Sequence, residues 1–152
     1  MKKENTKGAP IGKTNPPSAS DSAPYVGTAI VYQGLVLLGK RILVCPHTGE
    51  KVKFGGFWSV FAGAVEKNES HYLAAHREVL EETGFDLDKS RFEYVALIRG
   101  MRLYIYQSPE LIFPKIDYEH TESGWFKIEN LRISPSPVDK ALAKAIQAHT
   151  IV

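Results

Sequence analysis

The most constraining feature of this 152-residue chain is a stretch near its middle that carries clear signals for the beginning and the end of one helix. Ser70 is a favourable N-cap residue, Gly84 favours the left-handed conformation that ends helices, and neither glycine nor proline lies between them. A helical period of about 100° per residue places on one side Tyr72, Leu73, His76, Val79, Leu80 and Thr83. The pattern predicts an amphipathic helix whose apolar side packs on a core.

The opposite side of this helix is acidic and carries Glu78, Glu81 and Glu82, beside the small residues Ala74 and Ala75. Like charges at these spacings repel by a few tenths of a kcal/mol, and acids near the C-terminal end oppose the helix dipole. One interpretation is a solvated acidic face. The other is a metal site, because clustered carboxylate oxygens beside the open space that alanines leave suit Mg²⁺ or Mn²⁺.

The stretch from Gly63 to Phe85 resembles the signature of the Nudix hydrolases. That signature is a glycine, five residues, a glutamate, seven residues, Arg-Glu, an aliphatic residue, any residue, Glu-Glu, any residue, a glycine and an apolar residue. The matching positions are Gly63, Glu69, Arg77, Glu78, Val79, Glu81, Glu82, Gly84 and Phe85. The resemblance implies an α/β fold of the Nudix type, an α/β/α sandwich with a mixed sheet, a catalytic helix and a C-terminal helix. Periodicity alone supports only a mixed α/β domain.

The resemblance also implies roles for the motif side chains, because the glutamates of the family hold Mg²⁺ or Mn²⁺ ions that bridge substrate phosphates. Carried over by position, the expected metal ligands are Glu78, Glu82 and Glu81, and Glu81 also counts among the expected catalytic residues. Glu69 is expected to support a further ion or to orient the loop before the helix. Arg77 belongs to the expected catalytic set because it would hold the glutamates by ion pairing.

The start of the motif departs from the family pattern at two points. The family has Pro-Gly-Gly where this chain has Phe61-Ala62-Gly63, and a glycine where it has Asn68. Asparagine tolerates a positive φ, so Asn68 is expected to replace that glycine. The backbone carbonyl of Ala62 is expected to face the metal ion. Gly63 is expected to contact the substrate through its backbone, where a side chain would obstruct the loop.

A further carboxylate and the substrate contacts are expected outside the motif. Family members often supply a base from the loop before a tryptophan-containing strand, and Glu119, six residues before Trp125, fits this spacing better than Glu122. Basic and aromatic residues before the motif are expected to contact phosphates and a base, namely Arg41, Lys53 and Phe57.

The rest of the chain reads as strands around this helix, followed by a last helix. The expected elements are a hairpin of 26–32 and 35–40 around Gln33-Gly34, one strand at 57–61, a hairpin of 93–99 and 102–108 around Gly100-Met101, a loop at 117–123, a strand at 124–128 and a helix at 138–149.

Composition predicts a tail at 1–24, because these residues contain few large apolar side chains. The resemblance implies that 25–152 form one Nudix domain. Hydrophobic residues make up 43% of the chain, charged residues 24%, and the net charge is +2, so no strong field favours nucleic acid. The lone Cys45 excludes an internal disulfide. With no apolar run of membrane-spanning length, we expect a cytoplasmic protein without a membrane partner.

The resulting hypothesis is a metal-dependent pyrophosphohydrolase, with Mg²⁺ or Mn²⁺ as cofactor, that cleaves a nucleoside diphosphate linked to another moiety X. The alternatives are a hydrolase that removes altered (d)NTPs, a pyrophosphohydrolase of RNA 5′ ends, and a non-catalytic module that binds a nucleotide. The intact acid set argues against the last, because a pure binding protein needs no repelling glutamates. The expected partner is a small nucleotide, with RNA 5′ ends as the exception, and the expected state is a monomer or homodimer.

Overall fold

A computed structural model describes residues 23–150, so the predicted tail at 1–24 lies almost entirely outside the described residues. The elements in chain order are β1 (Tyr25–Tyr32), β2 (Leu35–Arg41), β3 (Trp58–Ser59), β4 (Phe61–Ala64), α1 (His71–Thr83), β5 (Phe92–Ile98), β6 (Met101–Gln107), β7 (His120–Lys127) and α2 (Lys140–His149), with 3₁₀ turns at Lys89–Arg91 and Ile128–Asn130.

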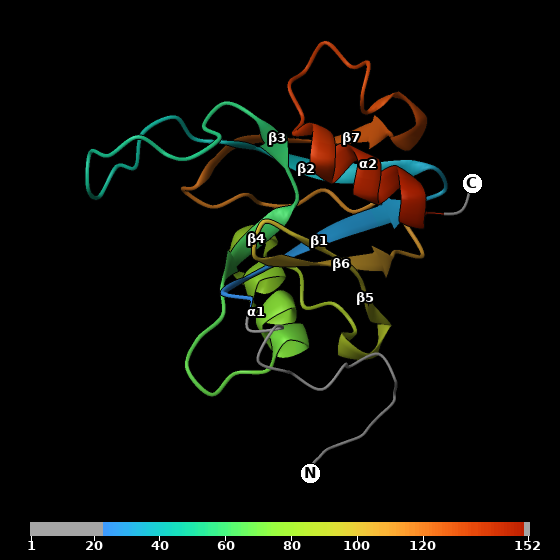
Figure 1. The fold of residues 1–152 in the computed structure, drawn as a ribbon, viewed down its shortest axis with the longest axis horizontal. Helices are drawn as coiled ribbons and strands as arrows, with labels where there is room; N and C mark the ends of the chain where they lie inside the picture. Colours follow the sequence, from blue (N-terminus) through green and yellow to red (C-terminus); the bar gives the residue numbers. More distant parts are fainter. Residues whose placement is uncertain (1–22, 151–152) are drawn as a thin grey trace.

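The strands form a mixed sheet that is built around β1 (Figure 1). β1 pairs in parallel with β6 on one side, and β5 continues that side antiparallel to β6. On its other side β1 pairs antiparallel with β4 through its first half and with β2 through its second half. β2 then diverges from β1 and pairs with β3 and β7. The sheet therefore opens between β4 and β2.

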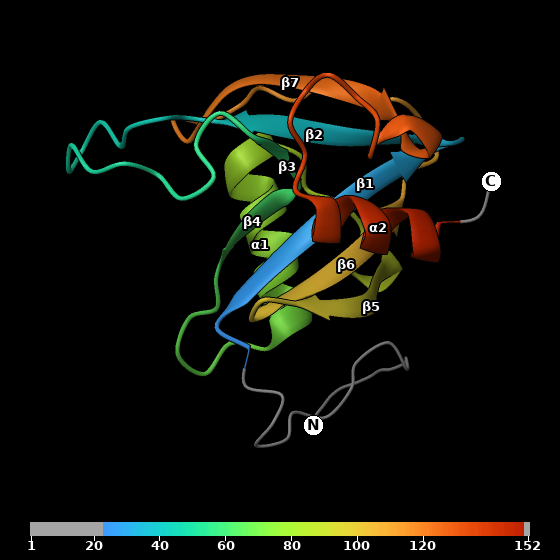
Figure 2. The same cartoon turned by 45° about the horizontal axis from the view of Figure 1, so that its top comes forward.

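Alternation along β1 divides the core between the faces of the sheet. Ala29 and Val31 pack in the cluster that holds α2, whereas Val26 and Ile30 pack in the cluster that holds α1. Figure 2 shows α2 in front of the sheet and α1 behind it. The predicted α/β/α sandwich is confirmed. No helix within residues 23–150 combines the length and apolar character needed to cross a bilayer.

The buried face of α1 is only partly the one predicted. His76, Val79 and Thr83 are buried as expected. Leu73 and Leu80 are each 38% exposed, whereas Ala74 is completely buried and Glu82 is only 2% exposed. The small alanines let the helix approach the sheet closely, where they pack with Phe61. The expected open space above the acids was therefore a wrong prediction, because the alanines lie inside the core and α1 turns its glutamates toward β4.

The ends of α1 follow local sequence signals. Gly84 has φ 81° and its N–H donates to the carbonyl of Leu80, as a left-handed C-cap does. Ser70 occupies the N-cap position, but its side chain makes no capping hydrogen bond. Asn68 has φ 65°, which confirms that it adopts the conformation predicted from the family glycine.

Several predicted element boundaries shift because strand pairing, rather than local sequence, decides them. The single strand expected at 57–61 is divided into β3 and β4, which pair with different neighbours. β7 begins at His120 instead of Gly124, since pairing with β2 extends it backwards. The turn of the β5–β6 hairpin is Arg99-Gly100, with φ 46° and 78°, one residue earlier than expected.

The last helix begins at Lys140, after Asp139, whose carboxylate accepts a hydrogen bond from the N–H of Leu142.

Residues 42–57 link β2 to β3 and form a two-stranded projection, which we call the arm. It extends away from the sheet in Figure 1. An antiparallel bridge joins Val44 to Lys51, and the N–H of Cys45 donates to the carbonyl of Glu50 at 2.9 Å. The arm is thus a hydrogen-bonded element rather than an irregular loop.

Candidate active site

Three carboxylates from distant parts of the chain meet beside α1. One carboxylate oxygen from each of Glu82, Asp117 and Glu119 lies within 4.8 Å of the others. Glu82 comes from α1, whereas Asp117 and Glu119 belong to the loop before β7. Glu122, the competing candidate, lies on the exposed side of β7, where its 59% exposed side chain pairs with Lys40 at 3.8 Å. The structure brings Glu119 to the motif glutamate and leaves Glu122 outside.

A β-bulge explains why the acids of this segment diverge. Lys40 pairs with Glu122 and Arg41 with His120, so Thr121 has no opposite residue on β2. The side chain of His120 points inward and is 1% exposed, while Glu122 points to solvent. The bulge breaks the usual alternation of the strand and separates Glu122 from the acid cluster.

Glu82 is the buried centre of this cluster. Its Oε1 accepts a hydrogen bond from the N–H of Ala62 at 3.1 Å. Its Oε2 is buried and accepts no hydrogen bond from a donor among residues 23–150. The contact from β4 to Glu82 is thus made by the amide of Ala62, whereas the sequence prediction concerned the carbonyl of this residue.

Burial raises the pKa of the Glu82 carboxyl above its usual range, and the neighbouring acids Glu78, Glu119 and Asp117 raise it further. Burial also raises the pKa of Glu78. Without a cation, the carboxyls of Glu82 and Glu78 therefore retain protons that an exposed carboxyl would release. A divalent cation would favour the ionised forms, because its charge reverses the effect of neighbouring acids.

The donor set suits a hard cation by two criteria. All of the clustered groups are carboxylates, which are the oxygen ligands that Mg²⁺ and Mn²⁺ prefer. In addition, Oε2 of Glu82 is a buried acceptor without a donor within the described part of the chain, and such an atom is costly unless something binds it. The residues therefore fit the ion that the motif implies.

Arg77 organises the remaining motif acids. Its Nε donates to Glu69 at 2.8 Å, and its Nη1 donates to Glu78 at 2.9 Å and to Glu81 at 3.3 Å. Its Nη2 donates to the carbonyl of Ala64 at 2.9 Å, which ties the helix to the end of β4. Arg77 thus makes the ion pairs that the sequence predicted for it.

Glu69 and Glu81 differ in their availability to an ion. Both oxygens of Glu69 bind Arg77, and one also accepts the N–H of Glu66 at 3.0 Å, so the carboxylate orients the loop before α1. The hydrogen bond to Arg77 lowers the pKa of Glu69. The side chain of Glu81 is 55% exposed and lies at the edge of the acid set.

Gly63 leaves room for the carboxylate of Glu78. A Cβ at position 63 would meet the carboxyl carbon of Glu78 at 2.1 Å and its oxygens at 2.2 Å. No real Cβ occupies that distance, so any side chain here must displace Glu78. The expected obstruction at Gly63 is therefore explained by a motif glutamate.

Gly63→Ala is expected to weaken Mn²⁺ binding by about 10–100-fold, the usual loss when the support of a metal ligand is removed. The reason is the forced movement of Glu78. Gly124→Ala is the matched control, since a Cβ there would meet nothing nearer than 3.8 Å. Mn²⁺ titration calorimetry on both variants measures the effect, and equal affinities for the two would contradict the argument.

The predicted substrate residues separate in the structure. Arg41 lines a pocket of about 480 Å³ together with Lys40, Leu43, Gly56, Trp58, Thr121 and Pro135–Pro137. Lys53 and Phe57 are not among the lining residues. Lys53 lies exposed on the arm, where its carbonyl accepts the Nε–H of Arg41 at 3.1 Å, and Phe57 packs edge-on against Phe54 at 5.5 Å.

Sequence reasoning missed Asp117 as a member of the acid cluster and Thr121 as a pocket residue. Asp117 Oδ1 lies 2.8 Å from Nδ1 of His120 and accepts the N–H of Glu119 at 3.2 Å. The only local signal was the polar spacing of Asp117, Glu119 and His120. Their convergence on Glu82 depends on how β7 pairs.

The mixed sheet between α1 and α2, with an acidic motif on α1, is the architecture of the Nudix hydrolases. A family model described as NUDIX domain matches residues 24–148, and the chain therefore belongs to this family. The predicted family and class of enzyme are confirmed.

Relatives illustrate the range of the family. The chain is 35% identical over 92 residues to "mRNA-decapping enzyme subunit 2" of Arabidopsis thaliana, a match that covers 55% of this chain and only 25% of that protein. It is 28% identical over 120 residues to "Oxidized purine nucleoside triphosphate hydrolase" of Danio rerio, covering 74% of this chain and 71% of that protein. The solved structure of a MutT NUDIX hydrolase from Burkholderia pseudomallei is 25% identical, with a TM-score of 0.62 over 83% of this chain and 96% of that one.

Proposed function

We propose that this protein is a Mg²⁺- or Mn²⁺-dependent pyrophosphohydrolase that splits the phosphoanhydride bond of a nucleoside diphosphate linked to another moiety X. The observation that carries the proposal is the position of Glu82. This carboxylate is buried, one of its oxygens accepts no hydrogen bond from a donor among residues 23–150, and oxygens of Asp117 and Glu119 lie within 4.8 Å.

Cleaving a phosphoanhydride requires neutralised phosphate oxygens, an activated water and in-line geometry. Glu78 and Glu82 would hold the ion, with Glu81 as an outer ligand and the Ala62 carbonyl as a candidate backbone ligand. When bound, the ion would supply charge neutralisation for the phosphate oxygens. Glu119 would accept the proton of the attacking water.

The remaining motif residues would position this set. Arg77 holds Glu69, Glu78 and Glu81 through hydrogen bonds of 2.8–3.3 Å, so it orients the acids rather than the substrate. Glu69 would act mainly on the loop, because Arg77 and a backbone amide occupy its oxygens. Gly63 would let the phosphates approach the backbone and leave Glu78 undisturbed.

The pocket of about 480 Å³ supports a nucleoside as one half of the substrate. Its size lies within the usual range for small-molecule sites. Trp58 and Pro137 supply apolar lining, and Arg41 supplies a cation. Thr121 lines the pocket two residues after Glu119, so the pocket borders the segment that carries the acid cluster. Lys53 and Phe57 are proposed as outer contacts for X.

RNA 5′ ends are the second candidate substrate. Lys51 and Lys53 are exposed on the arm, whose residues Leu43 and Gly56 line the pocket, and they would meet the phosphates of a longer chain. The likeness to a decapping subunit agrees with this candidate. Altered (d)NTPs remain a third, weaker candidate, because 135–138 contains no asparagine like the base-reading one of some family members.

A panel of substrates tests the proposal. Phosphate and nucleotide release from nucleotide sugars, dinucleoside polyphosphates, dNTPs and capped or triphosphorylated RNA would be measured with Mg²⁺, Mn²⁺ or EDTA. We expect a nucleoside monophosphate from an NDP-X substrate, and none with EDTA. Turnover of RNA alone would favour the second candidate. Nucleotide binding without turnover of any compound would contradict the enzyme proposal.

A cytoplasmic location and a monomeric or homodimeric state also belong to the proposal. Cys45 is a free thiol, as expected of a protein in a reducing compartment. Size-exclusion chromatography with light scattering would establish the oligomeric state.

A further inference from the structure

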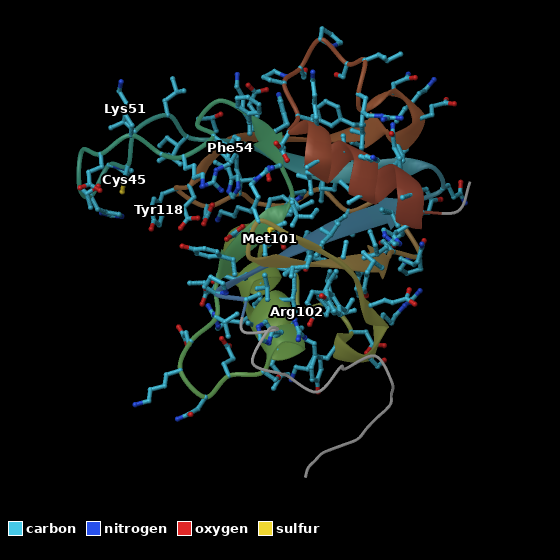
Figure 3. All side chains as sticks on the ribbon, in the orientation of Figure 1. Cys45, Lys51, Phe54, Met101, Arg102 and Tyr118 are labelled. Carbon is cyan, nitrogen blue, oxygen red and sulfur yellow. The ribbon has the colours of Figure 1, made fainter. Side chains whose placement is uncertain are left out.

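The arm at 42–57 contacts the loop that carries the remote acids. The N–H of Ile42 donates to the carbonyl of Glu119 at 2.9 Å. The ring of His47 packs edge-on against the ring of Tyr118, with centroids 4.7 Å apart and planes at 76°. Figure 3 shows Cys45 and Lys51 on the arm and Tyr118 on the neighbouring loop. The arm therefore contacts the loop at Glu119 and at the residue before it.

The loop residues divide between the acid cluster and the arm. Asp117 and Glu119 direct carboxylate oxygens toward Glu82, whereas Tyr118, between them, meets His47. The ring of Tyr118 is 53% exposed, so the body of the protein does not enclose it. The arm thus contacts the loop at the residue that lies between the two acids of the cluster.

The arm has enough internal structure to hold its position. The N–H of Gly49 donates to the carbonyl of Cys45 at 2.8 Å, and that of Val52 donates to Leu43 at 2.9 Å. The base of the arm is closed by a hydrogen bond from the N–H of Arg41 to Phe57 at 2.9 Å. His47 lies within the turn formed by Cys45 and Gly49, so these hydrogen bonds fix the backbone that carries its ring.

Three carboxylates whose oxygens lie within 4.8 Å repel one another when they are ionised, and this repulsion favours moving the loop away from Glu82. Contacts that hold the loop oppose that movement. We propose that the arm is a positioning element, with His47 as its positioning residue, that keeps Asp117 and Glu119 beside Glu82 and so increases the affinity of the acid cluster for a divalent cation. This inference rests on the proposed function. His47 acts through the packing of its ring, so an aromatic residue without a titratable group should fulfil the same role at this position.

Mn²⁺ affinity of the full chain, measured by titration calorimetry and by the electron paramagnetic resonance of free Mn²⁺, tests the role of the arm. His47→Ala is expected to weaken binding by about tenfold, within the range for lost support of a metal ligand. His47→Phe should restore the wild-type affinity. His149→Ala is the matched control, since His149 is exposed at the end of α2.

Tyr118 provides an independent route to the same contact. Tyr118→Ala should weaken Mn²⁺ binding as His47→Ala does, and the double variant should lose little more than either single one, because they remove the same contact. Unchanged affinity in His47→Ala, or failure of His47→Phe to restore it, would overturn the role of the arm and leave the proposed function intact. A wild-type protein that neither binds Mn²⁺ nor turns over any substrate would instead overturn the proposed function.

Discussion

Replacing Glu82 by glutamine is expected to lower turnover by about 10²–10³-fold, the loss typical of removing one preorganised electrostatic group. Glutamine keeps the shape of the side chain and can still accept the N–H of Ala62, but it cannot carry the charge that a cation needs. Initial rates at saturating Mg²⁺ measure the effect. Glu122→Gln is the matched control, because its side chain is 59% exposed and outside the cluster. Near wild-type turnover would refute Glu82 as a ligand.

In the metal-free protein, the same substitution is expected to raise the free energy of unfolding relative to the wild type, and the difference should grow as the pH rises. Burial raises the pKa of Glu82 in the folded state above the value of about 4.3 in an unfolded chain. At a pH between these two pKa values, the folded protein binds one proton that the unfolded chain has released. The contribution of Glu82 to the free energy of unfolding is therefore largest at low pH and falls by about 1.4 kcal/mol per pH unit. Glu82→Gln removes the pH dependence that Glu82 causes, although the pH dependence caused by Glu78 remains.

Urea unfolding in EDTA between pH 5 and pH 8 measures this dependence. The wild-type midpoint should fall as the pH increases, and the midpoint of Glu82→Gln should fall less steeply. Glu122→Gln should follow the wild type, because its carboxylate is exposed. Parallel curves for wild type and Glu82→Gln would show that Glu82 does not titrate with folding.

Glu119→Gln is expected to reduce kcat by about 10²–10⁴-fold, the range for loss of a general base. Its carboxylate lies within 4.8 Å of oxygens of Glu82 and Asp117, on a loop that hydrogen bonds and ring packing hold in place. Glu122→Gln should cost little, since Glu122 pairs with Lys40 on the exposed side of β7. Both variants should be measured at saturating Mg²⁺ across several pH values, so that weaker metal binding is not mistaken for slower chemistry.

The outcomes distinguish three assignments of the base. A severe defect in Glu119→Gln alone supports the loop carboxylate that the structure brings to α1. A defect in Glu122→Gln alone would require β7 to pair differently around Thr121. If neither variant is impaired, the base belongs to the motif, with Glu81 as the next candidate because its side chain is 55% exposed.

The sequence by itself determined the features that depend on neighbouring residues. Gly84 and Asn68 take the left-handed conformations predicted from residue type, with φ 81° and 65°. Gln33 and Gly34 form the predicted hairpin turn, and Arg77 makes ion pairs with Glu78 and Glu81 along one helix. Each of these rests on backbone preference or on helical spacing within a few residues. Interactions between residues that are close in the sequence were sufficient to determine these features.

Only the tertiary structure decided which groups surround Glu82. The N–H of Ala62 reaches it from β4, and Asp117 and Glu119 reach it from a loop more than thirty residues further along the chain. The choice of Glu119 over Glu122 depends on the pairing of β7 with β2 and on the bulge at Thr121. Helical period is a property of consecutive residues, whereas strand register is set by a partner far away in the chain. That difference explains why the sequence predicted the helix and its motif, while the buried acid cluster emerged only when the strands were paired.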